Sequence, residues 1–230
     1  VGVPVAVVTY WAAVGSSRGA AGDVLASAAA TSFGLSAAAA VLAVAAAVPV
    51  AVLAVRHRSR LSRAVETLSV SGYALPGLVI GLALVFFTAR YVGPLYQTLT
   101  LIVVAYVIRF LPEALGAVRS SLVQVDPALE EAARSLGRRP LSVTASVTLP
   151  LVRRGLLAGG VLVFLTAMKE LPATLLLRPP GVDTLALRVW TGAAEGRYAQ
   201  AAPAALAILA VSALVLWPLR TRSGSAGSAR

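Results

Sequence analysis

The sequence predicts an all-α membrane protein with about five full transmembrane helices, preceded by part of another helix. Three observations support this fold class. The 230 residues are 58% hydrophobic with a mean hydropathy of +0.85, and only 13% are charged, whereas soluble domains carry about 25% charged residues. Several uncharged stretches reach the length of about 20 apolar residues that crosses a bilayer. Arginines gather in alternate loops, which is typical of the cytoplasmic side.

The N-terminal half is expected to contain an incomplete helix and two spans. Residues 1–14 are apolar but too short to cross the bilayer, and we interpret them as the end of a truncated transmembrane helix. Residues 24–55 form the first full span. Residues 67–89 form the second, in which a Pro-Gly pair is expected to weaken or kink the helix. The basic segment between these spans, residues 56–66, is assigned to the cytoplasm.

The C-terminal half is expected to contain three further spans: residues 95–112, 155–177 and 198–219. The polar segment at 113–152 separates the first two of these spans and is rich in arginine, which places it in the cytoplasm. Residues 178–197 then lie outside the cell membrane. Residues 221–230 are polar and rich in Ser and Gly, so they are expected to form a disordered cytoplasmic tail.

The composition disfavours several kinds of function. Cysteine is absent and His57 is the only histidine, so no metal site is expected. The only lysine, Lys169, follows Met168 where a P-loop requires glycine, so any nucleotide chemistry belongs to a partner. The residues of an intramembrane protease are also lacking. We therefore expect no catalytic residues. The net charge of +11 is attributed to basic cytoplasmic loops rather than to a nucleic-acid partner.

A helix–turn–helix is expected within the long cytoplasmic segment. Asp126 and Pro127 form a strong helix start, as N-cap and first helical residue. Gly137 can adopt the left-handed conformation that ends such a helix. Pro140 then starts a second short helix, and Pro150 is expected to break that helix before the next span. The helical period places four apolar side chains on one face: Leu129, Ala132, Ala133 and Leu136.

This segment resembles the EAA motif of binding-protein-dependent ABC importer permeases. The motif is EAA, three residues, Gly, nine residues and I-x-L-P, and valine for isoleucine is the one departure here. The matching residues are Glu131, Ala132, Ala133, Gly137, Val147, Leu149 and Pro150. The resemblance implies the type I ABC importer permease fold over residues 24–220. It also implies that residues 119–152 form a coupling loop, which docks on an ATPase subunit.

The residue types suggest a role for each part of this loop. Alanines permit close approach of the ATPase, leucines supply apolar anchors, and Glu131 can pair with a basic group. Gly137 allows a sharp turn, and the Leu-Pro pair joins the loop rigidly to the next span. The residues expected to couple to the ATPase are Leu129, Glu131, Ala132, Ala133, Leu136, Gly137, Leu149 and Pro150. The chain itself is expected to need no cofactor, because the resemblance implies that two copies of the ATPase bind ATP.

Further segments resemble the C-terminal half of ferric-iron importer permeases: residues 71–77, 167–174 and 184–202. This resemblance implies that an extracytoplasmic binding protein delivers ferric iron to a multi-pass protein of the bacterial inner membrane, with a cytoplasmic C-terminus. A second permease half, covalently attached or a second copy, would complete the pathway. Thiamine, polyamine, phosphonate and sulfate remain alternative substrates. An ion-coupled secondary transporter is the alternative from another class, and it predicts buried carboxylates near the membrane midplane.

Charged side chains inside the fourth span mark a candidate translocation pathway. Lys169 and Glu170 lie in this span, where charges are costly and usually face a partner or a water-filled path. Pro172 is expected to break the helix beside them. We interpret these three residues as bordering the pathway. The alternatives are a structural ion pair with another helix and a snorkelling side chain near the external face. Arg109 and Glu113, one turn apart at the end of the third span, are expected to form an ion pair at the interface.

Overall fold

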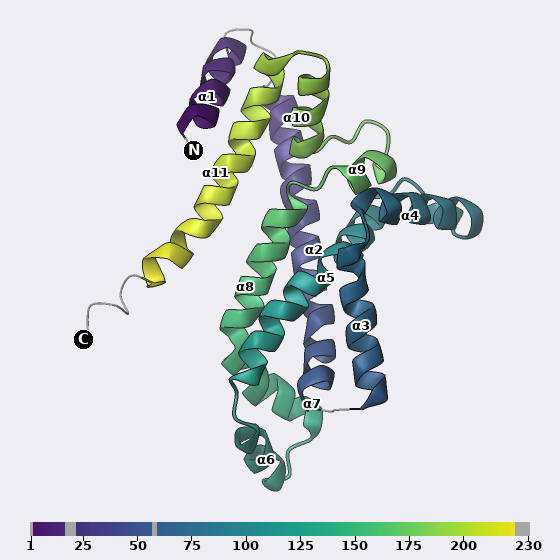
Figure 1. Cartoon of the computed structure of the whole chain (residues 1–230), viewed down its shortest axis with the longest axis vertical. Coiled ribbons are helices and arrows are strands. Elements are labelled where there is room, and N and C mark those ends of the chain that lie inside the picture. Colours follow the sequence, from purple (N-terminus) through teal and green to yellow (C-terminus); the bar gives the residue numbers. More distant parts are fainter. Residues whose placement is uncertain (1, 17–21, 57–58, 224–230) are drawn as a thin grey trace.

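The computed structural model describes residues 2–16, 22–56 and 59–223, and within these ranges every regular element is helical. Three long helices form the centre of the bundle (Figure 1): α2 (Gly22–Arg56), α5 (Leu99–Val123) and α8 (Leu149–Ala167). Within the described residues, four helices are long and apolar enough to cross a membrane, or five if one bent pair counts as a single span. The predicted fold class is therefore confirmed.

Small residues allow the central helices to approach closely. Along α2, alanines recur at every fourth position and are fully buried: Ala39, Ala43, Ala47 and Ala51. On α8, a Cβ at Gly155 would lie 2.6 Å from the Cβ of Ser121 and 2.9 Å from the carbonyl oxygen of Ala117 on α5. Such contacts matter in lipid, where close van der Waals packing, rather than the hydrophobic effect, holds helices together.

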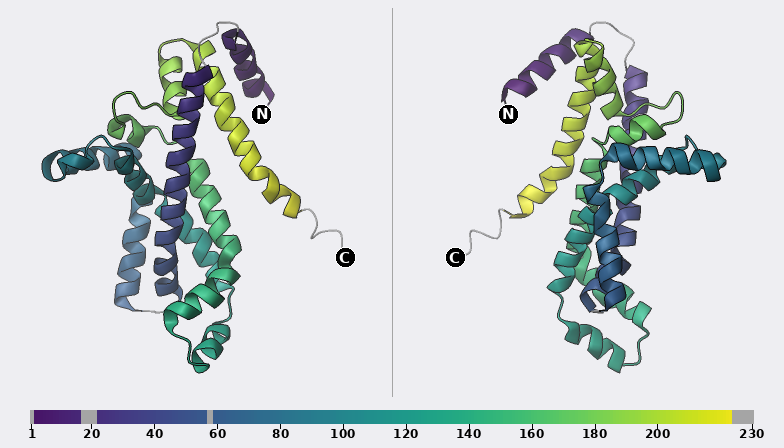
Figure 2. Two further views of the ribbon diagram at one scale, coloured as in Figure 1. Left: turned by 180° about the vertical axis from the view of Figure 1, so that it is seen from behind. Right: turned by 45° about the vertical axis from the view of Figure 1, so that its right-hand side comes forward.

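The second predicted span is broken into two helices. α3 (Arg60–Ala74) and α4 (Gly77–Tyr91) meet at an angle of 107°, and α4 leaves the bundle sideways (Figures 1 and 2). The predicted kink is thus a complete break, because Pro76 holds the preceding residue in an extended conformation. The connection between α2 and α3 is also shorter than predicted, since α3 already begins at Arg60, where Ser59 caps it.

The predicted end of the third span at residue 112 is wrong, because α5 continues through Pro112 to Val123. Proline leaves the carbonyl four residues earlier, that of Ile108, without its helical donor. Helix α3 packs directly against this carbonyl, where a Cβ at Gly72 would collide with the Ile108 oxygen. Neighbouring helices commonly stabilise such interrupted turns in membrane proteins.

The predicted break at Pro150 is also wrong. α7 (Pro140–Val143) continues through a π-helical turn, η2 (Thr144–Thr148), into α8 without interruption. A proline ring crowds the carbonyl four residues before it and supplies no N–H. The wider π turn lies immediately before Pro150, where it accommodates the ring by shifting the hydrogen bonds from the i−4 to the i−5 carbonyl. α7, η2 and α8 therefore form one continuous helix.

α1 (Gly2–Ser16), α10 (Leu185–Ala194) and the start of α11 (Tyr198–Ser223) lie at the end of the bundle opposite α6 (Pro127–Ser135) and α7 (Figure 1). α11 then runs back toward the other end, and α9 (Pro172–Leu177) lies beside α4. The break predicted at Pro172 is confirmed, because α8 ends at Ala167. α1 packs along α11, with the rings of Trp11 and Tyr198 5.7 Å apart. The interpretation of residues 1–14 as a truncated span stays a prediction.

The predicted C-terminal tail is partly helical. Helix α11 extends to Ser223, so residues 221–223 belong to the helix and the predicted boundary is wrong. A helix that has already formed continues at little cost, because each further residue adds a hydrogen bond. Residues 224–230, and His57 in the loop after α2, lie outside the described residues.

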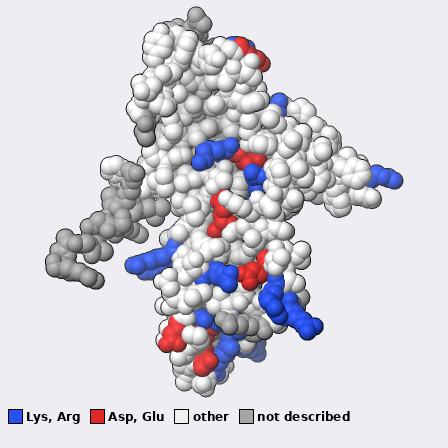
Figure 3. All heavy atoms as spheres, in the orientation of Figure 1, with Lys and Arg blue, Asp and Glu red and all other residues white. Residues whose placement is uncertain are grey.

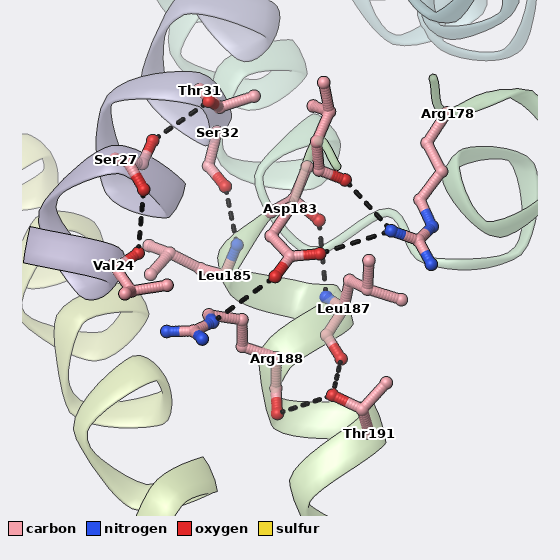
Figure 4. A network of polar contacts seen from close by, with 12 residues as sticks. Val24, Ser27, Thr31, Ser32, Arg178, Asp183, Leu185, Leu187, Arg188 and Thr191 are labelled. Atoms are coloured by element: carbon pink, nitrogen blue, oxygen red, sulfur yellow. Dashed lines mark hydrogen bonds and ion pairs between the residues drawn. The ribbon is translucent and has the colours of Figure 1, made fainter. Parts of the chain in front are cut away.

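The segment between α9 and α10 is fastened by a polar network (Figure 4). The Asp183 carboxylate accepts a hydrogen bond from Arg178 at 3.2 Å and lies 3.7 Å from Nε of Arg188. The Leu185 N–H at the start of α10 donates to the Ser32 hydroxyl of α2 at 2.8 Å. These contacts therefore hold α10 against the central bundle.

Candidate functional site

The first helix of the predicted helix–turn–helix begins and ends where the sequence predicts. α6 (Pro127–Ser135) starts at Asp126, whose Oδ1 accepts a hydrogen bond from the Ala128 N–H at 2.9 Å. Gly137 follows the helix with a φ of +81°, in the left-handed region that favours glycine. Both local signals are confirmed, and they leave α6 as a separate short helix beyond the end of the bundle (Figure 1).

The four apolar residues predicted to share one face of α6 differ in their burial. Ala133 is buried at 9% exposure and faces the bundle together with Glu130. Leu129 and Leu136 are 50% and 83% exposed, and Ala132 is exposed beside them. Residues three apart lie on the same side of a helix, so the buried Glu130 draws Ala133 inward. Exposed leucines facing away from the bundle form an apolar surface suited to a partner protein.

The other predicted coupling residues are divided between the loop surface and the continuous helix. Glu131 is exposed, and its side chain forms no ion pair within the described part of the chain. Leu149 and Pro150 lie in the first turn of α8, immediately after the π-helical turn. The structure thus brings the α6 residues to one exposed surface, while the Leu-Pro pair lies in the helix that connects this surface to the membrane.

Sequence reasoning missed the buried Glu130. Its carboxylate is an ion-pair partner of Arg56 at 3.2 Å and accepts a hydrogen bond from the Thr148 hydroxyl at 3.0 Å. The neighbouring Glu131 belongs to the motif, whereas no motif position marks Glu130. Arg56 lies 74 residues away in sequence, and no periodicity links such distant positions.

A second polar site lies where two helix breaks meet. Nε of Arg109 on α5 lies 3.2 Å from Oε2 of Glu170 in the break between α8 and α9. The same guanidinium donates to the Leu75 carbonyl, in the break between α3 and α4, at 3.1 Å. Oε1 of Glu170 accepts a hydrogen bond from the Ala173 N–H at 3.2 Å. One ion pair therefore joins α5 to both breaks.

The predicted ion pair between Arg109 and Glu113 is wrong. Glu170 is only 7% exposed, and a carboxylate removed from water requires a charged partner far more than one nearer the surface. Arg109 therefore pairs with Glu170. Glu113 instead accepts a hydrogen bond from the Thr166 hydroxyl at 3.0 Å. Helical spacing within α5, taken alone, predicts Glu113 as the partner of Arg109, which is wrong.

Close packing fixes the geometry of this ion pair. A Cβ at Gly77 would collide with Oε1 of Glu170 and lie 3.0 Å from Nη1 of Arg109. The Thr174 hydroxyl donates to the Glu170 carbonyl at 3.0 Å and lies 2.6 Å from the Tyr106 hydroxyl. In the space-filling view, a small group of acidic and basic side chains interrupts the uncharged surface near the middle of the molecule (Figure 3).

The three predicted pathway residues lie together at the break between α8 and α9. Glu170 is buried, Lys169 beside it is exposed, and Pro172 starts α9. Charged groups at broken helices in the middle of a membrane protein are typical of transport pathways. The long apolar helices, the interior ion pair and the short helix beyond the bundle define a multi-pass membrane protein of the transport class.

Comparison with known proteins identifies the family. Residues 39–219 match the model of the binding-protein-dependent transport system inner membrane component. The chain belongs to this family, and the predicted resemblance to ABC importer permeases is confirmed.

Individual relatives agree with this assignment. The chain is 40% identical over 222 residues to the Fe(3+)-transport system permease protein FbpB 2 of Haemophilus influenzae, covering 96% of this chain and 44% of that protein. A Streptomyces antibioticus protein described as an ABC transporter permease, ORF1, is 34% identical over 208 residues, covering 88% and 89%. The chain thus spans under half the length of the Haemophilus relative and most of the Streptomyces one.

The fold also matches a solved transporter. The MetNI methionine ABC transporter in an inward-facing conformation aligns with a TM-score of 0.69, covering 84% of this chain and 92% of that chain. Their sequence identity is 16%, so this likeness concerns the fold alone. The predicted ABC importer permease fold is confirmed.

Proposed function

We propose that this permease carries ferric iron from an extracytoplasmic binding protein into the cytoplasm, driven by two copies of a separate ATPase. The 40% identity with a protein named as an Fe(3+)-transport permease supports the substrate. The pathway lies between this chain and a second permease half, either covalently attached or a second copy. The observation that carries the coupling role is α6, a short helix that presents exposed leucines away from the bundle.

The proposed ATPase contact is the outward surface of α6 and the turn after it. Leu129 and Leu136 are at least half exposed and would fill apolar pockets of the ATPase, where buried leucine side chains each contribute about 1.5–3 kcal/mol. Ala132 between them lets the partner approach closely, and Glu131 would pair with a basic group. The continuous helix through Leu149 and Pro150 would then pass movement of this surface to the membrane.

Replacing Glu131 with arginine should weaken co-purification of the ATPase about five-fold, which corresponds to about 1 kcal/mol for an exposed ion pair. Gln124→Arg introduces the same side chain at an exposed cytoplasmic position at the end of α5, and it should leave the complex intact. The measurement is the ratio of ATPase to permease after affinity purification. Equal retention by both variants would contradict the proposed contact.

The same wild-type complex tests the substrate. In proteoliposomes, the iron-loaded binding protein should stimulate ATP hydrolysis more than the iron-free protein does, because only the loaded protein should favour the ATP-hydrolysing state. Binding proteins loaded with thiamine, a polyamine, a phosphonate or sulfate serve as comparisons. If one of these stimulates hydrolysis and iron does not, the substrate assignment is wrong while the importer assignment holds.

We also propose that Lys169, Glu170 and Pro172 border the translocation pathway. The break in α8–α9 exposes Lys169 while Glu170 remains paired inside the protein. A broken helix frees backbone groups at membrane depth, and such groups occur where they face a cavity or protein rather than lipid. Opening and closing of the path would then involve the two helix breaks that Arg109 connects.

The proposed topology places α6 and the C-terminus in the cytoplasm and α10 outside the inner membrane. The chain has no cysteine, so each introduced cysteine reports on its own position. A membrane-impermeant maleimide should label Ala193→Cys at the exposed end of α10 in spheroplasts. It should label Ser135→Cys in α6 only after the membrane is permeabilised. The reverse pattern would contradict this orientation.

A further inference from the structure

The Glu130 carboxylate lies at the meeting point of three segments at the cytoplasmic end of the bundle. Its Oε1 accepts hydrogen bonds from Nε and Nη2 of Arg56, the last residue of α2, at 3.3 and 3.2 Å. It also accepts one from the hydroxyl of Thr148, the last residue before α8, at 3.0 Å. Arg56 Nη2 additionally donates to the Val125 carbonyl at 2.9 Å, immediately before the N-cap of α6.

These charged groups are buried and therefore depend on their partners. The side chains of Arg56 and Glu130 are 11% and 8% exposed, and Thr148 is 3% exposed. A buried carboxylate is tolerated only while its donors remain in place, so separation of any of the three segments leaves charged groups unpaired. Ala133 is the only other buried residue of α6, all of which the structure describes. The Glu130 contacts are therefore the principal non-covalent attachment of α6 to the bundle.

We propose that the contact of Glu130 with Arg56 and Thr148 is the joint through which displacement of α6 moves α2 and α8. The inference rests on the proposed coupling function and adds the residues that transmit the movement. Leucines on the outer surface of α6 contact the ATPase, and Glu130 on its inner surface holds the bundle. Because α2 ends and α8 begins at this carboxylate, displacement of α6 reaches two central helices together.

Spin labels on cysteines at Leu157 of α8 and Leu82 of α4, both exposed, measure the movement without any transported substrate. Binding of ATP with vanadate should change their separation in the wild-type complex with its ATPase. Glu130→Ala should lower the equilibrium constant between the two separations about five-fold or more, the lower end of typical coupling effects, while ATPase retention stays near wild type. Thr148→Val removes one donor at similar volume and should have a smaller effect.

The control variants distinguish a specific loss of the Glu130 contact from a nonspecific disruption of the structure. Arg134→Ala removes the half-exposed arginine 4.0 Å from the other Glu130 oxygen and should leave the movement unchanged. The charge exchange Arg56→Glu with Glu130→Arg should restore at least part of the movement lost in Glu130→Ala. A full ATP-driven change in Glu130→Ala would overturn the joint alone. If the wild-type chain never retains the ATPase, the proposed coupling function and the joint fall together.

Discussion

Replacing Glu170 with alanine should abolish transport and destabilise the permease. The Arg109 guanidinium would lose its partner at 3.2 Å while still enclosed by the two helix breaks. Removing one member of a buried ion pair costs about 3–5 kcal/mol, because the other charge remains desolvated and unpaired. The melting temperature of the purified protein should therefore fall. Because Glu170 is proposed to border the path, uptake should be lost as well.

A double variant separates a pathway role from a structural one. Replacing both partners, Arg109→Met with Glu170→Leu, removes the unpaired charge, and such exchanges often restore stability. If Glu170 borders the path, the melting temperature should recover while uptake remains lost. Recovery of uptake as well would show that the ion pair is structural only. Glu113→Ala serves as a control, because its carboxylate bonds Thr166 outside the ion pair.

Local signals in the sequence predict much of the fold, and three of its prolines show where they fail. Pro76 breaks its span completely, Pro112 is absorbed within α5, and Pro150 follows a π-helical turn in a continuous helix. Each proline removes the same donor. The outcome depends on the neighbours, such as the bare backbone of Gly72 beside the freed carbonyl of Ile108, and these neighbours are not adjacent in sequence.

The candidate site likewise contains some features that local sequence predicts and others that it does not. Asp126 and Gly137 act on their own helix, so the start and end of α6 follow from the sequence. The partners of Glu130 and Glu170 come from other helices, and the nearest candidate by helical spacing, Glu113 for Arg109, is not chosen. Burial decides which charges pair, and burial is set by the packing of the whole bundle.

Replacing Gly137 with valine should disrupt the end of α6 without altering the membrane bundle. The N–H groups of Gly137 and Arg138 donate to the carbonyls of Arg134 and Ala133 at 2.9 and 3.3 Å, which is the Schellman pattern that requires a left-handed residue. A residue with a Cβ pays about 1–2 kcal/mol there. The population with a correctly ended α6, and with it ATPase retention, should fall about ten-fold.

Backbone conformation alone should cause this loss, because a Cβ at position 137 meets no atom within 4 Å. Gly137→Asn should therefore retain most of the complex, since asparagine visits the left-handed region readily. Gly116→Val provides a matched control in α5, where a Cβ also meets nothing within 4 Å but φ is not positive. ATPase retention is measured by co-purification for all three variants. Equal loss of the ATPase for valine and asparagine at position 137 would mean that the ATPase does not require this turn geometry. We expect greater retention for asparagine than for valine, because α6 must end at the turn around Gly137 to present Leu136 outward.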